Sequence, residues 1–222
     1  HALVNIIPSI LNQKDLNLYG ICTRDKLILE DNKNILSCLA WNDYSEMLKD
    51  KKIDIVYLST PIGLHAEQGV KILNAGKHFW CEKPLSSNLS DTKNLINLSK
   101  QKKLSISEGF MYLYHPQFLR LKELIKENIL GNITNVNIRF GIPFLEKPGF
   151  RFSSELSGGA FWDVGSYPIS AALSLFPNEN YEVIFSNILS HQNYQVDTKG
   201  SAKILFNNGV EVNIDWAIGS SY

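Results

Sequence analysis

The chain has no excess charge of either sign, because its 22 lysine and arginine residues equal its 22 aspartate and glutamate residues. A balanced chain offers no bulk electrostatic attraction to nucleic acid or to an anionic membrane surface. No run approaches the roughly 18 apolar residues of a membrane-spanning helix, and the first residues do not form a signal-peptide pattern. We therefore expect no nucleic acid and no membrane as a partner.

Cysteine is scarce, with only Cys22, Cys38 and Cys81 in 222 residues. This odd, widely spaced set suits neither a disulfide framework nor a metal site. It predicts buried thiols in a reducing compartment, with the cytoplasm as the location and no metal. The hydrophobic content of 44% and charged content of 20% are those of an ordinary globular protein, long enough for one large or two modest domains.

The first half of the chain alternates between two kinds of segment. Short apolar runs predict strands at residues 16–22, 38–41, 53–58, around Phe79 and at 104–107. Helical spacing appears at residues 44–49, 65–73 and 91–100, and residues 1–11 resemble the latter part of a helix kinked at Pro8. Residues 26–35 are polar and are interpreted as irregular. Strands alternating with helices in this way predict a parallel sheet.

The second half has a different pattern. Strands are predicted at residues 133–140, 182–189, 202–206 and 210–216, with a hairpin turn at Asn207-Asn208-Gly209 and helices at 116–128 and 168–175. We predict an α/β protein in which a Rossmann-like parallel sheet domain, residues 1–107, precedes an α+β domain with a mostly antiparallel sheet, residues 108–222. No flexible linker marks the boundary near Glu108.

An acid and a base stand at the end of one predicted strand. The apolar run through Phe79 leads directly into Glu82 and Lys83, and Pro84 ends the ladder because it has no N–H to donate. In open α/β sheets, ligands bind at the carboxyl ends of the strands. A lysine held there can donate to a substrate oxygen. The alternative is a solvated pair that only caps the strand.

Four local patterns, in one order, carry a family resemblance. They are Ser59-Thr60-Pro61 with His65, then Cys81-Glu82-Lys83-Pro84, then Glu108-Gly109-Phe110-Met111-Tyr112 through His115-Pro116, and last Gly158-Gly159-Ala160-Phe161-Trp162-Asp163-Val164-Gly165-Ser166-Tyr167. Together they resemble the Gfo/Idh/MocA family of NAD(P)-dependent oxidoreductases, which act largely on sugars, sugar nucleotides, inositols and related diols. The Phe-Met-Tyr stretch and Tyr167 are most similar to the aldose dehydrogenase, dihydrodiol dehydrogenase and nucleotide-sugar ketoreductase branches.

The resemblance implies that Lys83, Asp163 and Tyr167 are catalytic. Lys83 would bridge the nicotinamide ribose and the substrate hydroxyl, where a cation stabilises the charge that develops during hydride transfer. Asp163 would bind a substrate hydroxyl. Tyr167, often a histidine in the family, would pass the proton, with the nearby Lys83 ammonium lowering its pKa. The alternative is a structural Tyr167 that donates to the backbone.

The resemblance also implies cofactor contacts, to NADP or NAD, from Thr23, Arg24, Thr60, Pro61, His65, Glu82 and Lys83. Arg24 slightly favours NADP, because arginine at this place accommodates a 2′-phosphate. A threonine–arginine pair can instead simply cap the strand. His65 is equally well interpreted as a helix residue that makes a local hydrogen bond.

Arg151 and Trp162, with Asp163 and Tyr167, are expected to line the substrate site, since guanidinium groups and aromatic faces suit polyhydroxylated ligands. Arg151 and Trp162 are equally well interpreted as residues that only pack against their neighbours. The expected partners are a carbohydrate substrate and further copies of the chain, as a homodimer or homotetramer assembled through the antiparallel sheet.

The family's first strand and its Gly-x-Gly-x-x-Gly turn, which seats the pyrophosphate on a helix N-terminus, are absent from the sequence, as are the family's last strands. If the chain is complete as given, we expect neither tight dinucleotide binding nor turnover. The alternative function is therefore an inactive family member or fragment that serves as a sugar-binding or assembly module.

Overall fold

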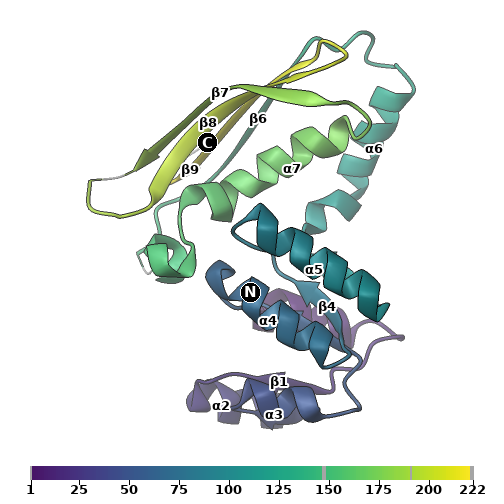
Figure 1. Cartoon of the computed structure of the whole chain (residues 1–222), viewed down its shortest axis with the longest axis vertical. Coiled ribbons are helices and arrows are strands. Elements are labelled where there is room, and N and C mark those ends of the chain that lie inside the picture. Colours follow the sequence, from purple (N-terminus) through teal and green to yellow (C-terminus); the bar gives the residue numbers. More distant parts are fainter. Residues whose placement is uncertain (1, 147–148, 191, 221–222) are drawn as a thin grey trace. The chain divides into compact units, whose positions relative to one another are not determined.

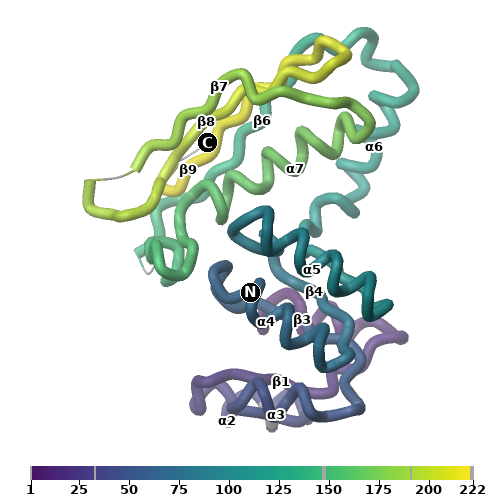
Figure 2. The backbone as a smooth tube through the Cα atoms, in the orientation of Figure 1, coloured from purple at the N-terminus to yellow at the C-terminus, as the bar shows by residue number. Residues whose placement is uncertain are grey.

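The computed structural model describes residues 2–146, 149–190 and 192–220 (Figures 1 and 2). The chain forms two compact units, each assembled from several segments. The first contains residues 1–59, 67–81 and 93–107, and the second contains residues 60–66, 82–92 and 108–222.

The first unit is built on parallel strand pairs. β1 (Gly20–Cys22) pairs with β2 (Leu39–Trp41), and β3 (Ile55–Leu58) pairs with β4 (His78–Cys81), both in parallel. β5 (Ile106–Glu108) lies on the other side of β4. The helices between these strands are α2 (Lys26–Leu36), α3 (Tyr44–Lys49), α4 (Ile62–Asn74) and α5 (Leu89–Lys102). The parallel Rossmann-like sheet predicted from the alternating pattern is confirmed.

The prediction of an irregular segment at residues 26–35 is wrong, because α2 occupies it. The carboxylate of Asp25 accepts the backbone N–H groups of Leu27, at 3.0 Å, and Ile28, at 3.2 Å. A carboxylate that takes these otherwise unpaired donors starts a helix. Before this helix, the predicted strand at 16–22 is shortened to Gly20–Cys22.

The helix expected at the N-terminus is present. A π-helical turn, η1 (Ala2–Ile6), continues into α1 (Ile7–Leu11). Pro8 lies inside this continuous helical run and has no N–H to donate to the preceding turn, and the π-helical turn stands just before it.

The second unit contains a four-stranded sheet in the order β6 (Asn135–Ile142), β9 (Glu211–Ile218), β8 (Asp197–Phe206), β7 (Tyr181–Ser190). β6 and β9 are parallel, whereas β8 pairs antiparallel with both β7 and β9. Gly209, at φ +85°, closes the predicted hairpin between β8 and β9, which the backbone trace follows in Figure 2. The sheet is thus mixed and mostly antiparallel, as predicted.

Helices cover one side of this sheet. α7 (Ser166–Leu175) lies along the sheet face in Figure 1, and the π-helical turn η5 (Phe161–Gly165) leads into it. α6 (Pro116–Lys126) follows the short 3-10 turn η2 (Met111–Tyr114), and two more such turns, η3 (Gly149–Phe152) and η4 (Ser154–Leu156), precede η5.

Trp216 on β9 fixes η5 to the sheet. Its indole is 1% exposed and fits a space that two glycines leave open. A Cβ on Gly200 of β8 would lie 2.3 Å from the ring, and a Cβ on Gly165 of η5 would lie 3.0 Å from it. The ring therefore sets how closely the turn approaches the strands.

We predict that G200A destabilises the protein by about 1–3 kcal/mol, because the added methyl overpacks the Trp216 slot. Chemical denaturation of the variant measures the loss. S201A, one residue along β8 on the opposite sheet face, is the control and should change the free energy of unfolding by less than about 0.5 kcal/mol. Equal stability of G200A and wild type would contradict the proposed role of the slot.

Candidate functional site

Lys83 is the centre of a buried charged cluster in the second unit. It follows β4 by two residues, and its side chain is 10% exposed. Its ammonium donates to the backbone carbonyl of Asp163 and lies 3.2 Å from the Oδ1 atom of that residue. The same nitrogen lies 4.6 Å from the ring centre of Tyr167. The structure thus brings the three predicted catalytic residues together.

Asp163 binds two cations at once. Its second oxygen, Oδ2, accepts a hydrogen bond of 2.6 Å from Nε of Arg151, which belongs to η3. The Asp163 side chain is 9% exposed, so both charge contacts lie largely out of water. A buried carboxylate requires such pairing, because desolvating an unpaired charge is costly.

The backbone around Asp163 departs from a regular α-helix. Asp163 lies in the π-helical turn η5, directly before α7. Pro168, five residues after Asp163, has no N–H to offer its carbonyl in a π-helical pattern. The lysine ammonium supplies a donor at this carbonyl. Single π-helical turns of this kind are frequent at functional sites.

Tyr167 is held by aromatic side chains. Its ring centre lies 4.7 Å from that of Phe140, 5.7 Å from that of Phe110 and 6.1 Å from that of Tyr112. Burial, followed by the nearby carboxylates of Glu82 and Asp163, raises the pKa of Tyr167 to about 12. This shift is opposite in sign to the lowering expected from Lys83, whose ammonium lies over the ring face and is bonded to Asp163. Tyr167 is a protonated phenol at neutral pH.

Asp197 on β8 supports the cluster, and the sequence analysis missed it. Its Oδ2 atom accepts the N–H of Phe161 at 2.6 Å, at the start of the turn that carries Asp163. A Cβ on Gly159, at φ +111°, would lie 2.3 Å from the other Asp197 oxygen. Burial raises the pKa of Asp197, and the Phe161 N–H opposes that rise. Glycine at position 159 permits this close approach, and no pattern in the sequence named Asp197 as the neighbour.

His65 links two backbone segments of the second unit. It is fully buried, with Nε2 2.8 Å from the carbonyl of Thr60 and Nδ1 2.8 Å from the carbonyl of Pro84. This geometry matches the interpretation of His65 as a hydrogen-bonding residue. It fixes the turn of Thr60 and Pro61 to the residue after Lys83.

Thr23 and Arg24 belong to the first unit, directly after β1. The N–H of Thr23 donates to the carbonyl of Trp41 at 3.1 Å, and its hydroxyl accepts the N–H of Asp25 at 3.2 Å. The side chain of Arg24 is exposed. Thr23 thus closes the strand, while Arg24 is open to a ligand.

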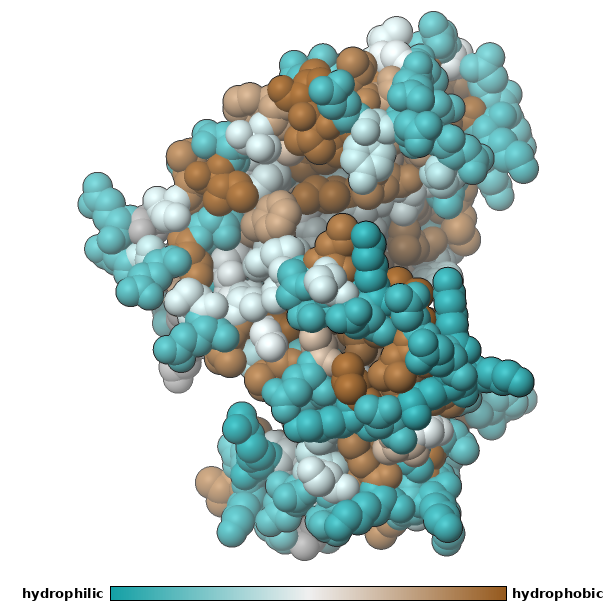
Figure 3. Space-filling view, viewed as in Figure 1, coloured by the Kyte–Doolittle hydropathy of each residue, from teal (hydrophilic) through white to brown (hydrophobic). Residues whose placement is uncertain are grey.

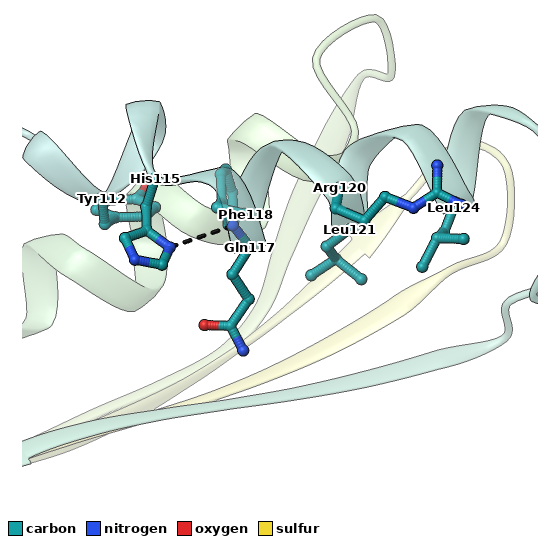
Figure 4. A pocket seen from close by; sticks show the side chains of 7 residues that line it. All are labelled: Tyr112, His115, Gln117, Phe118, Arg120, Leu121 and Leu124. Atoms are coloured by element: carbon teal, nitrogen blue, oxygen red, sulfur yellow. Dashed lines mark hydrogen bonds between the residues drawn. The ribbon is translucent and has the colours of Figure 1, made fainter.

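Two hollows of the second unit differ in their relation to these residues. One, of about 550 Å³, includes Trp162, Pro84, Glu108 and Ser166 in its wall, and Trp162 packs edge-on against Phe161. The other, of about 630 Å³, runs along α6 and contains no predicted catalytic residue (Figure 4). In it, His115 accepts the N–H of Gln117 and caps the helix, as the dashed line shows.

Within residues 2–146, 149–190 and 192–220, no group of three or more histidine, cysteine, aspartate or glutamate side chains could hold a metal ion. Among the same residues, no helix is long and apolar enough to cross a membrane. The three cysteines are free thiols.

A parallel Rossmann-like sheet followed by a second, mostly antiparallel sheet defines the chain as a Rossmann-type α/β protein. Its residues 4–110 match the family model described as oxidoreductase family, NAD-binding Rossmann fold, and residues 118–222 match the Gfo/Idh/MocA C-terminal domain. The chain belongs to the Gfo/Idh/MocA family.

Several characterised proteins are similar to it. A dTDP-3,4-didehydro-2,6-dideoxy-alpha-D-glucose 3-reductase from Saccharopolyspora spinosa is 29% identical over 98% of this chain and 65% of its own length. A trans-1,2-dihydrobenzene-1,2-diol dehydrogenase from Danio rerio is 32% identical over 65% of this chain and 43% of its own. The crystal structure of KijD10, a 3-ketoreductase from Actinomadura kijaniata, in complex with NADP and TDP-benzene has a TM-score of 0.94 and 26% identity, covering 100% of this chain and 68% of that chain. The chain thus spans less than two thirds of the length of these two curated relatives.

We predict that Tyr167 makes the protein less stable above pH 10. Because its pKa is raised from 10 to about 12 in the fold, its contribution to stability is complete below pH 10 and is lost as the pH rises towards 12. The loss is on the order of 1 kcal/mol after solvent screening of this partly exposed group. Denaturation of wild type and Y167F from pH 9 to pH 12 measures it. Parallel pH curves for the two proteins would show that the shift is absent.

Proposed function

We propose that the protein transfers a hydride between NAD(P) and a carbon of a sugar, nucleotide sugar or related polyol. The observation that carries the proposal is the convergence of Lys83, Asp163 and Tyr167 in one buried cluster. A lysine, a carboxylate and a phenol together can bind a carbinol or carbonyl group, stabilise its developing charge and move its proton.

Each side chain has a distinct task in the reduction direction. When bound, the nicotinamide cofactor supplies or accepts the hydride. The ammonium of Lys83 stabilises the negative charge that forms on the substrate oxygen. Tyr167, a phenol at neutral pH, gives this oxygen its proton, and Asp163 orients Lys83 and the substrate hydroxyl. The oxidation direction reverses these transfers.

The residues fit a dinucleotide at the ends of the parallel strands. β3 and β4 end in register, with Leu58 opposite Cys81, so that the turns beginning at Ser59 and Glu82 both leave the carboxyl edge of the sheet. We propose Thr23, Arg24, Thr60, Pro61, Glu82 and Lys83 as cofactor contacts, with His65 holding the turn. NADP is the preferred form, because the exposed Arg24 suits a 2′-phosphate.

The relatives support a nucleotide sugar as the substrate. The Saccharopolyspora spinosa protein is named as a reductase of a dTDP-linked sugar, and KijD10 was solved with NADP and TDP-benzene. Solved KijD10 variants replace one lysine and one tyrosine. Those two positions have the same separation along that chain as Lys83 and Tyr167 have here.

We assign dinucleotide binding to residues 1–107 and substrate binding and oligomerisation to residues 108–222. The convergence of a lysine, a carboxylate and a phenol in one cluster favours hydride transfer over the alternative of an inactive module. The cytoplasmic location inferred from the scarce cysteines stays a prediction.

We further propose that β7 forms the interface of a homodimer or homotetramer. Every residue of β7 is exposed, and the strand carries the large apolar side chains of Val183, Ile184, Phe185, Ile188 and Leu189. Apolar side chains gather over the four-stranded sheet in Figure 3. An exposed apolar strand of this length favours association and is otherwise prone to aggregate.

We predict that K83M and Y167F nearly abolish turnover of the intact gene product. Removing the ammonium should lower kcat by about 10²–10³-fold, and removing the phenol by about 10²–10⁴-fold. Nicotinamide absorbance with NADPH or NADH and a panel of aldoses, ketosugars, dTDP-sugars and trans-dihydrodiols measures the rate. K126M, at an exposed site on α6, is the control. Wild-type turnover rates in both K83M and Y167F would contradict the catalytic roles proposed for Lys83 and Tyr167.

We predict that V183E/F185E dissociates the oligomer, since two buried charges in an apolar interface would lack partners. Size-exclusion chromatography with light scattering should give a dimer or tetramer mass for wild type and a monomer mass for the variant. K126E controls for the added negative charge. A wild-type protein that is already monomeric, or a variant of unchanged mass, would contradict the interface.

A further inference from the structure

We propose that Arg151 is a positioning residue that occupies the second oxygen of Asp163 and thereby leaves the Lys83 ammonium available to the substrate. This inference deepens the proposed function and rests on it for its catalytic part. It differs from the expected role of Arg151, which was direct contact with the substrate.

The contact distances show how the carboxylate is shared. Arg151 Nε lies 2.6 Å from Oδ2 of Asp163, whereas Lys83 Nζ lies 3.2 Å from Oδ1. Charge-assisted bonds strengthen as they shorten, so Arg151 is the tighter partner and Lys83 the looser one. Arg151 and Lys83 thus bind different oxygens of one carboxylate. Without Arg151, the Asp163 carboxylate would be left to Lys83 and would hold the ammonium away from a developing alkoxide.

Arg151 is itself fixed by the backbone next to Asp163. The N–H of Gly159 donates to the carbonyl of Arg151 at 2.8 Å, and a Cβ on Gly158 would lie 2.6 Å from that carbonyl oxygen. The guanidinium lies over the ring of Phe150, 5.3 Å from its centre. Arg151 thus contacts the segment around Asp163 through both its main-chain carbonyl and its side chain. These two contacts suit a residue that positions Asp163.

Kinetics separate the positioning role of Arg151 from a substrate contact. Arg151 directs Nε at Asp163, and its side chain is 34% exposed, against 9% for the carboxylate it holds. A positioning role predicts a loss in kcat with little change in KM, whereas a substrate contact predicts the reverse.

The test compares R151M, R151K and wild type in the intact gene product. R151M should lower kcat on the order of 100-fold, through displacement of Asp163 and Lys83, with KM for the sugar nearly unchanged. R151K restores the charge and should recover part of kcat. R139M removes an arginine whose Nε pairs with Asp215 at 3.2 Å on an exposed strand, and it should behave as wild type.

A second measurement does not depend on turnover. Acylation of Lys83 by acetic anhydride, followed by mass spectrometry with exposed Lys126 as internal reference, reports how tightly Asp163 holds the ammonium. It should be several-fold slower in R151M than in wild type, because Asp163 is then left to Lys83 alone. Melting temperatures and the R151K variant show whether the fold is retained.

The outcomes are distinct. Slower acylation together with a kcat loss at constant KM supports the proposal. Unchanged acylation in folded R151M, or a raised KM at unchanged kcat, overturns it. If Lys83 is acylated more slowly in R151M but the wild-type protein reduces no substrate, the positioning role of Arg151 stands. The proposed function is then rejected.

Discussion

The contact between the Lys83 ammonium and Asp163 is the interaction on which the candidate site depends. Removing both charges from water costs several kcal/mol per ion, and their mutual attraction alone does not secure the pair. The structure offsets this cost with two further partners. The lysine also donates to the Asp163 carbonyl, and the carboxylate also accepts from Arg151. Both contacts form only if the backbone places the Asp163 carbonyl and Arg151 correctly, so the charge pair depends on the surrounding fold.

Three contacts of different kinds meet those demands within the second unit. Trp216, packed against Gly200 and Gly165, sets the height of the turn above the sheet. Asp197 caps the start of the same turn through the Phe161 N–H. His65 fixes the chain at Pro84, immediately after Lys83. One contact is steric, one is a charge-assisted hydrogen bond and one joins two loops, and losing any of them would displace one end of the Lys83 and Asp163 contact.

The sequence predicted the elements that have a strong local signal. Apolar runs located β3 and β4, and Asn207-Asn208-Gly209 located the hairpin. α2 was missed because Leu27, Ile28 and Ile35 are exposed and leave no single buried stripe, although Asp25 was a usable cap signal. The motifs located Lys83, Asp163 and Tyr167. They could not give the partner of Arg151, the contact of Asp197 or the sign of the Tyr167 shift, because these depend on which distant side chains pack together.

The raised pKa of Tyr167 keeps this side chain a phenol, which is the form that can give a proton to the substrate oxygen in reduction. An alcohol ionises near the pKa of water, about 16, so an alkoxide takes a proton from an ordinary phenol strongly downhill. Raising the pKa of the phenol to about 12 narrows this gap and makes the return transfer less unfavourable. Because Lys83 lies over the ring face and bonds to Asp163, its charge remains available to the substrate oxygen without ionising the tyrosine.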